Sequence, residues 1–204
     1  MATLKSLTSK RASRGFSLIE TLVAMFVLAV GLVSLAGLGA QMVTTTSNSH
    51  YASVAADLAS EKLEDLNRWP TFDPNVYAAS ASTAGSLTSD QSANVTSGGI
   101  GPELVNYYDD VTIADTSGAI SETVSLVASG SPSYKTTTHN PDGTITTSTS
   151  TSAPSLIGSL DFHRRWTIEM DQPVTGIRRV TVLVTLQNQM VHPPITFQMS
   201  MVRP

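Results

Sequence analysis

Residues 14–40 read RGFSLIETLVAMFVLAVGLVSLAGLGA, and this stretch decides the first part of the fold. After Glu20 comes a long apolar run, residues 21–40, whose twenty residues carry no charge. As a helix they span about 30 Å, the thickness of the hydrocarbon core of a bilayer. Lys and Arg precede this run, and none follows until Lys62. By the positive-inside rule, residues 1–15 stay in the cytoplasm and the rest of the chain is exported.

The composition narrows the class of protein. The chain has 204 residues, a length that suits one domain or one domain with an appendage. Only 14% of its residues are charged. It has no cysteine, which excludes disulfide scaffolds, thiolate zinc sites, iron–sulfur clusters and cysteine nucleophiles. The net charge of -4 gives no reason to expect specific binding of nucleic acid. Residues 1–15 contain four basic residues and no acid, so the body of the chain is acidic.

Three interpretations of the apolar segment compete. A secretory signal peptide could be cleaved after Leu38-Gly39-Ala40, but its apolar region is normally shorter and carries no charge such as Glu20. A plain single-span anchor accounts for the length but leaves Glu20 as a costly charge. The third interpretation is a prepilin-type segment.

The stretch 14–24, RGFSLIETLVA, resembles the cleavage and methylation motif of the type IV prepilin family. It has a basic leader, Gly15, Phe16, a Glu at the fifth position after Gly15, and then apolar residues. The resemblance implies that a prepilin peptidase cleaves between Gly15 and Phe16 and N-methylates Phe16. A carboxylate one helical turn further on can neutralise the new amine inside a filament. We therefore expect Glu20 to pair with the Phe16 amine of a neighbouring subunit or of its own.

Apolar residues continue at helical spacing beyond the membrane segment. They are Tyr51, Val54, Ala55, Leu58, Ala59 and Leu66. The run ends at Trp69-Pro70, because the residue before a proline is pushed out of α geometry. The spacing predicts an amphipathic helix that covers a sheet.

Three segments near the C-terminus alternate apolar and polar residues. Their apolar members are Trp166, Ile168 and Met170, then Val180, Val182, Val184 and Leu186, then Ile195, Phe197, Met199 and Met201. Turn sequences at 173–176 and 192–194 separate them, which predicts an antiparallel meander with one buried face. The helical stripe of 51–66 can cover that face.

Residues 71–160 are rich in Ser, Thr, Ala and Gly, and we expect mostly loops and thin strands there. Residues 104–113 are predicted to contain a strand. Residues 134–150 are predicted to form a surface hairpin around the turn sequence 140–143, NPDG.

The predicted fold is therefore α+β and pilin-like. The helix and the meander predict this architecture independently of the cleavage and methylation motif. A long N-terminal α-helix, transmembrane in its first half, packs on a C-terminal antiparallel β-sheet with Ser/Thr-rich loops. The predicted organisation is a basic leader at 1–15 that is removed, a transmembrane and polymerisation helix at 16–40, an amphipathic continuation at 41–69, and a β-rich head at 70–204.

Few other residues point to chemistry. His50, His139, His163 and His192 lack the spacing of metal ligands, and no nucleophile elbow, phosphate loop or dinucleotide fingerprint is present. We therefore expect no enzyme activity, no metal and no cofactor. Asp109, Asp110 and Asp115 could hold calcium, but a solvated acidic turn is the favoured interpretation.

Two further patterns are weaker. Asn94-Val95-Thr96 fits a glycosylation sequon. The pairs 164–165 and 178–179, all arginine, could form a basic edge for a partner or phosphate, but protection of strand edges is favoured.

Residues 29–32, AVGL, and 162–166, FHRRW, are similar to PilV-type minor pilins. The resemblance implies a structural subunit that helps to initiate or modify type IV pilus assembly. It implies as partners a prepilin peptidase, other major and minor pilins, an inner-membrane assembly platform and membrane lipid. The expected location is the bacterial inner (cytoplasmic) membrane, single-pass with the head exported, and then the pilus or pseudopilus. A type II secretion pseudopilin, a major pilin and a membrane-anchored surface-binding protein remain as alternatives.

Overall fold

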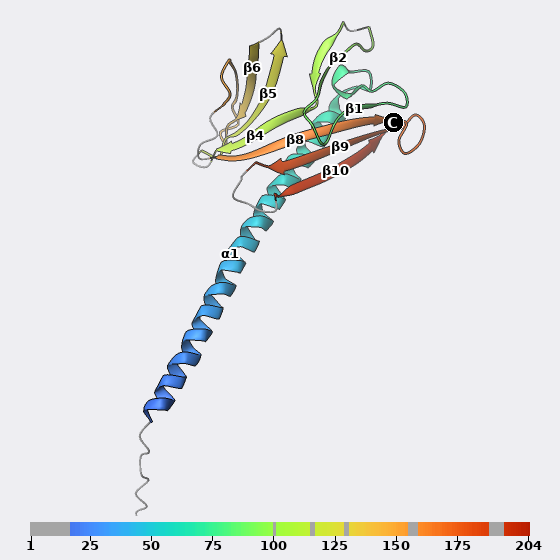
Figure 1. Cartoon of the computed structure of the whole chain (residues 1–204). Helices are drawn as coiled ribbons and strands as arrows, with labels where there is room; N and C mark the ends of the chain where they lie inside the picture. Colours follow the sequence, from blue (N-terminus) through green and yellow to red (C-terminus); the bar gives the residue numbers. More distant parts are fainter. Residues whose placement is uncertain (1–16, 100, 115–116, 129–130, 155–158, 188–193) are drawn as a thin grey trace, which may run out of the picture. The chain divides into compact units, whose positions relative to one another are not determined.

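The computed structural model describes residues 17–99, 101–114, 117–128, 131–154, 159–187 and 194–204. The chain divides into two compact units, residues 1–47 and 48–204. One long helix, α1 (Leu18–Arg68), contributes residues to both. The remaining elements belong to the second unit and form an antiparallel β-sheet, so the predicted α+β, pilin-like architecture is confirmed (Figure 1).

Helix α1 begins where local hydrogen bonds favour it. Ser17 Oγ accepts the backbone N–H of Glu20 at 3.3 Å, the contact of an N-terminal cap. The Thr-rich stretch is poor helix material, yet it stays helical. There the hydroxyls of Thr44, Thr45 and Thr46 donate to carbonyls one turn back, at 2.8–2.9 Å for the shortest bond of each.

The helix ends at Arg68, two residues before Pro70, as the sequence predicts. Arg203, on the last strand, donates to the carbonyls of Leu66 at 3.1 Å, Asn67 at 3.2 Å and Trp69 at 3.0 Å. These carbonyls lack partners within the helix, so Arg203 caps its C-terminus from the sheet.

The main sheet has eight strands in the order β10-β9-β8-β4-β5-β6-β7, and β1 also pairs with β8. A separate pair joins β2 and β3, and a short 3-10 helix, η1 (Pro74–Val76), follows α1. The strands are β1 (Thr83–Gly85), β2 (Ser92–Val95), β3 (Glu103–Asn106), β4 (Tyr108–Ala114), β5 (Ile120–Ala128), β6 (Ser131–His139), β7 (Ile145–Ser150), β8 (Ser159–Met170), β9 (Arg178–Leu186) and β10 (Thr196–Arg203). Figure 1 shows β10, β9, β8 and β4 as neighbouring strands of this sheet.

The core lies between residues 51–66 of α1 and one face of the sheet. The buried helix residues are Ala55, Leu58, Ala59, Leu63 and Leu66. They share one hydrophobic cluster with alternate residues of β8 and β9, namely Phe162, Trp166, Ile168, Val180, Val182, Val184 and Leu186. The predicted cover of the sheet by the helical stripe is confirmed, and Leu63 is an addition to that stripe.

Strand β8 is the centre of the head. Along one side it pairs with β9 over residues 162–170. Along the other it pairs with β4 over 159–165 and with β1 over 167–169. At the junction, a Cβ on Gly85 would lie 2.3 Å from the carbonyl oxygen of Trp166, and its φ is +80°, so only glycine fits there.

The predicted meander is confirmed as β8, β9 and β10, and the hairpin as β6 and β7. The predicted strand at 104–113 is two strands, β3 and β4, separated at Tyr107. Loops and thin, exposed strands were expected at 71–160, but residues 120–128 form β5, an internal strand between β4 and β6 whose described side chains are buried or partly buried.

Candidate functional site

The N-terminal part of α1 presents apolar side chains to its surroundings on all sides. Fifteen large apolar residues between 18 and 43 are exposed, including Leu18 at 83% and Phe26 at 68%. Burial of each is worth about 1.5–3 kcal/mol, so leaving all of them in water would cost on the order of 20 kcal/mol or more. That exceeds the whole stability of a typical domain. Among the described residues, α1 is the one helix long and apolar enough to cross a membrane.

Glu20 is the acidic residue of the first turn of this helix, and it is exposed. A carboxylate is favourable there, because the first turn carries the positive end of the helix dipole. Its backbone N–H donates to the Ser17 carbonyl at 3.0 Å. The predicted cleavage residues Gly15 and Phe16 lie outside the described residues, so the pairing of Glu20 with the Phe16 amine stays a prediction.

Small residues interrupt the apolar surface without breaking the helix. Gly31, Gly37 and Gly39 lie within α1, and a Cβ at any of them would meet no atom within 4 Å. Their open surroundings would let another helix approach closely, which is the role of small residues between helices in lipid.

A buried ionic cluster ties α1 to the sheet. Asp109 on β4 accepts from Lys62 of α1 at 3.0 Å and from Arg164 of β8 at 2.7 and 2.8 Å. Arg164, with no exposed surface, also donates to Glu122 of β5 at 2.6 Å. Burial by itself would raise the pKa of Asp109, but the cations of Lys62 and Arg164 lower it to about 2. Lys62 Nζ also lies 4.3 Å from the centre of the Trp166 ring.

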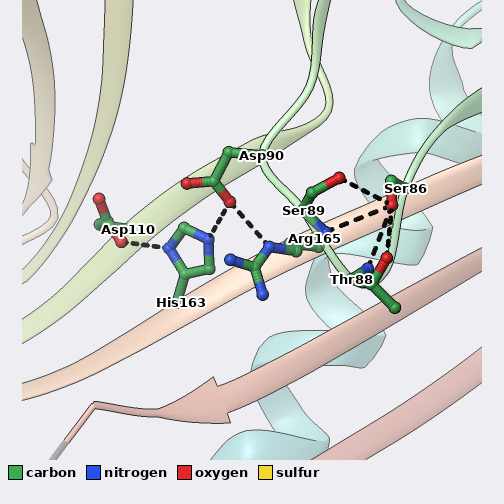
Figure 2. Close-up of polar contacts among 7 residues, drawn as sticks. All are labelled: Ser86, Thr88, Ser89, Asp90, Asp110, His163 and Arg165. Carbon is green, nitrogen blue, oxygen red and sulfur yellow. Dashed lines mark hydrogen bonds and ion pairs between the residues drawn. The ribbon is translucent and has the colours of Figure 1, made fainter.

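A second ionic cluster lies on the opposite face of the same two strands (Figure 2). His163 on β8 places Nδ1 2.5 Å from Asp110 Oδ1 on β4, and Nε2 2.8 Å from Asp90 Oδ1. Arg165 Nε donates to the same Asp90 oxygen at 2.7 Å. An open cavity of about 540 Å³ borders this cluster.

The structure corrects two interpretations of charged residues. Asp109 and Asp110 do not form a solvated acidic turn or come together as calcium ligands, because they lie on opposite faces of β4 and each pairs with β8. Asp115 lies outside the described residues. The arginines do not protect a sheet edge, since β8 and β9 are internal strands, and Arg164 is fully buried.

The His163 cluster was not predicted from the sequence. Its residues do not have the spacing of a local motif, because the partners of His163 lie 53 and 73 residues away in the chain. The alternation of β8 was the available signal, because it places His163 and Arg165 together on the face away from the helix. Asn94 of the sequon lies exposed on β2, and its glycosylation stays a prediction.

Comparison with known proteins identifies one part of the chain. Residues 10–36 match the prokaryotic N-terminal methylation motif, the type IV prepilin-like motif that includes Glu20 and the start of α1. The match indicates membrane anchoring through the apolar helix, and it implies processing by a prepilin peptidase and assembly with other pilins. No curated protein and no solved structure matches the chain.

Proposed function

We propose that this chain is a minor pilin, a structural subunit that helps to initiate or modify type IV pilus assembly after cleavage between Gly15 and Phe16. One observation carries the proposal. The methylation motif at 10–36 includes the start of α1, whose first turn holds Glu20 and whose large apolar side chains between residues 18 and 43 are exposed. Such a surface is stable only in lipid or among other apolar helices.

In the proposed assembly pathway, the apolar N-terminal part of α1 is shielded from water at every step. Before assembly the helix spans the inner membrane, with the head on the exported side. During assembly an inner-membrane platform moves the helix from lipid into the filament, where helices of other pilins replace the acyl chains. Gly31, Gly37 and Gly39 provide places for close helix contact. We propose a structural and not a catalytic role for the head, whose acid and base side chains at β4 and β8 are engaged in ion pairs.

The first test is the N-terminus and intact mass of the protein extracted from its native membrane. The proposal expects a chain that begins at N-methylated Phe16. A chain that begins after Ala40 would make it a secreted protein, and one that begins at Met1 or Ala2 would make it a plain anchor. Either result would end the pilin interpretation.

Glu20→Ala tests the role of the carboxylate. We expect normal cleavage after Gly15 but at least about tenfold less protein in sheared filaments, because an apolar interface would then bury an unpaired amine. Glu61→Ala, at an exposed position of the same helix, is the matched control. Normal incorporation of Glu20→Ala would contradict the neutralisation of the amine.

A deletion strain separates the minor pilin from its alternatives. Loss of pili with intact protein secretion supports the pilus assignment, whereas loss of secretion with intact pili identifies a type II secretion pseudopilin. Abundance in sheared filaments distinguishes a minor subunit from a major one.

A further inference from the structure

The loop of residues 86–90 is a compact turn on the outer face of the sheet (Figure 2). Ser86 Oγ accepts the backbone N–H groups of Thr88 at 3.2 Å and Ser89 at 3.3 Å. Its hydroxyl also bonds those of Thr88 at 3.1 Å and Ser89 at 3.2 Å. Within the described part of the chain, every side-chain hydrogen bond or ion pair from this loop to the sheet passes through Asp90.

The attachment of Asp90 depends on the number of protons that His163 carries. An ionised carboxylate only accepts hydrogen bonds, and a neutral imidazole has one N–H. His163 has a carboxylate oxygen 2.5 Å from Nδ1 and another 2.8 Å from Nε2. Both contacts are hydrogen bonds only when both ring nitrogens are protonated. The geometry is therefore that of an imidazolium.

We propose that His163 is a proton-controlled clasp: as an imidazolium it binds Asp110 and Asp90 together, and as a neutral ring it releases the 86–90 loop from the sheet. Asp110 is the fixed side, because it lies directly opposite His163 in the β4–β8 ladder. Asp90 is the movable side, because it lies in the loop. When the neutral ring keeps its Nδ1 proton for Asp110, Nε2 carries a lone pair and no proton. It then cannot donate a hydrogen bond to the carboxylate of Asp90.

The surroundings of His163 favour the charged form. Burial lowers the pKa of His163, but the hydrogen bonds and charges of Asp110 and Asp90 outweigh burial and raise it above its ordinary value. The other titratable groups that face it are Arg165 beside Asp90, Tyr108 on β4, with its ring centroid 5.9 Å from that of His163, and Asp161 and Tyr134 on the cavity wall. Strand β9 places an uncharged residue, Thr185, opposite His163.

Release of the loop changes the cavity beside the cluster, and Arg165 restricts how far the loop can move. Asp90, Asp110, His163 and Arg165 all line the open cavity of about 540 Å³, so movement of the loop widens it and exposes its carboxylates. The limit is Arg165, which still holds Asp90 when His163 is neutral. Arg165→Gln removes this second tether and should make release more complete.

The test uses the full chain in a nonionic detergent, with histidine labelled by ¹⁵N and ¹³C. Ring nitrogen shifts report the protonation state of each histidine between pH 5 and 9. His163→Gln assigns the signal, and His139→Gln, at an exposed position in the hairpin, is the matched control. Amide hydrogen exchange of residues 86–90, corrected for the intrinsic pH dependence, reports loop release, and tryptophan fluorescence verifies that each variant is folded.

We expect His163 to be doubly protonated at neutral pH and to lose a proton above the ordinary range for histidine. As it does so, exchange of the loop amides should rise about tenfold or more, the equivalent of one lost hydrogen bond between charged groups. The rise should be larger in Arg165→Gln. It should be absent in His163→Gln, in which Arg165 alone holds Asp90 at every pH, and unchanged in His139→Gln. Loop exchange that stays constant while His163 titrates, or a rise of equal size in His163→Gln, would overturn the proposal.

Discussion

The buried carboxylate of Asp109 should be the most sensitive polar position of the head. In Asp109→Asn, Lys62 and Arg164 lose their shared anion, and Arg164 has no exposed surface through which water could replace it. Removal of one partner from a buried ion pair costs about 3–5 kcal/mol. A typical domain is stable by roughly 5–15 kcal/mol, so the variant should retain its fold with a much reduced free energy of unfolding.

The lowered pKa of Asp109 shows how much of this cost depends on the charge of the carboxylate. It lies at about 2 in the folded protein, against an ordinary value of 3.8. This difference corresponds to roughly 2–3 kcal/mol of stability. Because the folded pKa is the lower one, this contribution is complete above about pH 4–5 and is lost as the pH falls towards 2. A protonated Asp109 resembles Asn, so the difference between wild type and Asp109→Asn should shrink by that amount over the same range.

The assay is urea unfolding of the full chain in a nonionic detergent, followed by the fluorescence of Trp166, which is buried beside Lys62. Asp57→Asn, at an exposed position of α1, is the control and should change the free energy of unfolding by less than about 0.5 kcal/mol. The reasoning is refuted if Asp109→Asn costs as little as the control at pH 7, or if its cost is the same at pH 7 and pH 3.

Three further substitutions test a close backbone contact and an exposed ion pair of the head. Gly85→Ala should destabilise the head by about 2–4 kcal/mol, because the new Cβ would lie 2.3 Å from a backbone oxygen of β8 and φ is +80°. Gly143→Ala, with a φ of +85° and nothing within 4 Å, should cost about 1–2 kcal/mol, and equal losses in urea unfolding would contradict the role of the close contact. Glu169→Gln breaks an ion pair with Arg179 whose side chains are 25% and 40% exposed, so it should cost less than about 1 kcal/mol, and a larger loss in the same assay would contradict this assignment.

The periodic parts of the fold could be predicted from the sequence. The helical stripe of 51–66 and the alternation of β8, β9 and β10 are repeated patterns of apolar residues, and burial on one face produces such patterns directly. The methylation motif could be identified for a different reason, because its residues are adjacent in the chain.

Strand β5 could not be predicted by the same criterion. Its residues on the helix side of the sheet include Ile120, Glu122 and Val124, so a charge interrupts the apolar pattern in the middle of the strand. Glu122 is tolerated there because Arg164, 42 residues away, donates to it. The local pattern of hydrophobic residues cannot identify an ion-pair partner that lies so far away in the chain.

The two ionic clusters depend on the register of β4 against β8, and no local feature of either strand specifies it. In the observed register, Asp109 lies opposite Arg164 on the helix side, and Asp110 lies opposite His163 on the outer side. A shift of one residue would turn one strand over and move its buried side chains to the outer face. A shift of two residues in one direction would place Asp110 opposite Asp161, and like charges in that position repel. A shift of two residues in the other direction would leave Asp109 and Arg164 buried opposite apolar side chains, without the charge that stabilises each of them. The acid–base pairs on both faces therefore select the one register that satisfies all four groups, and the same choice that builds the core brings His163 to its two carboxylates.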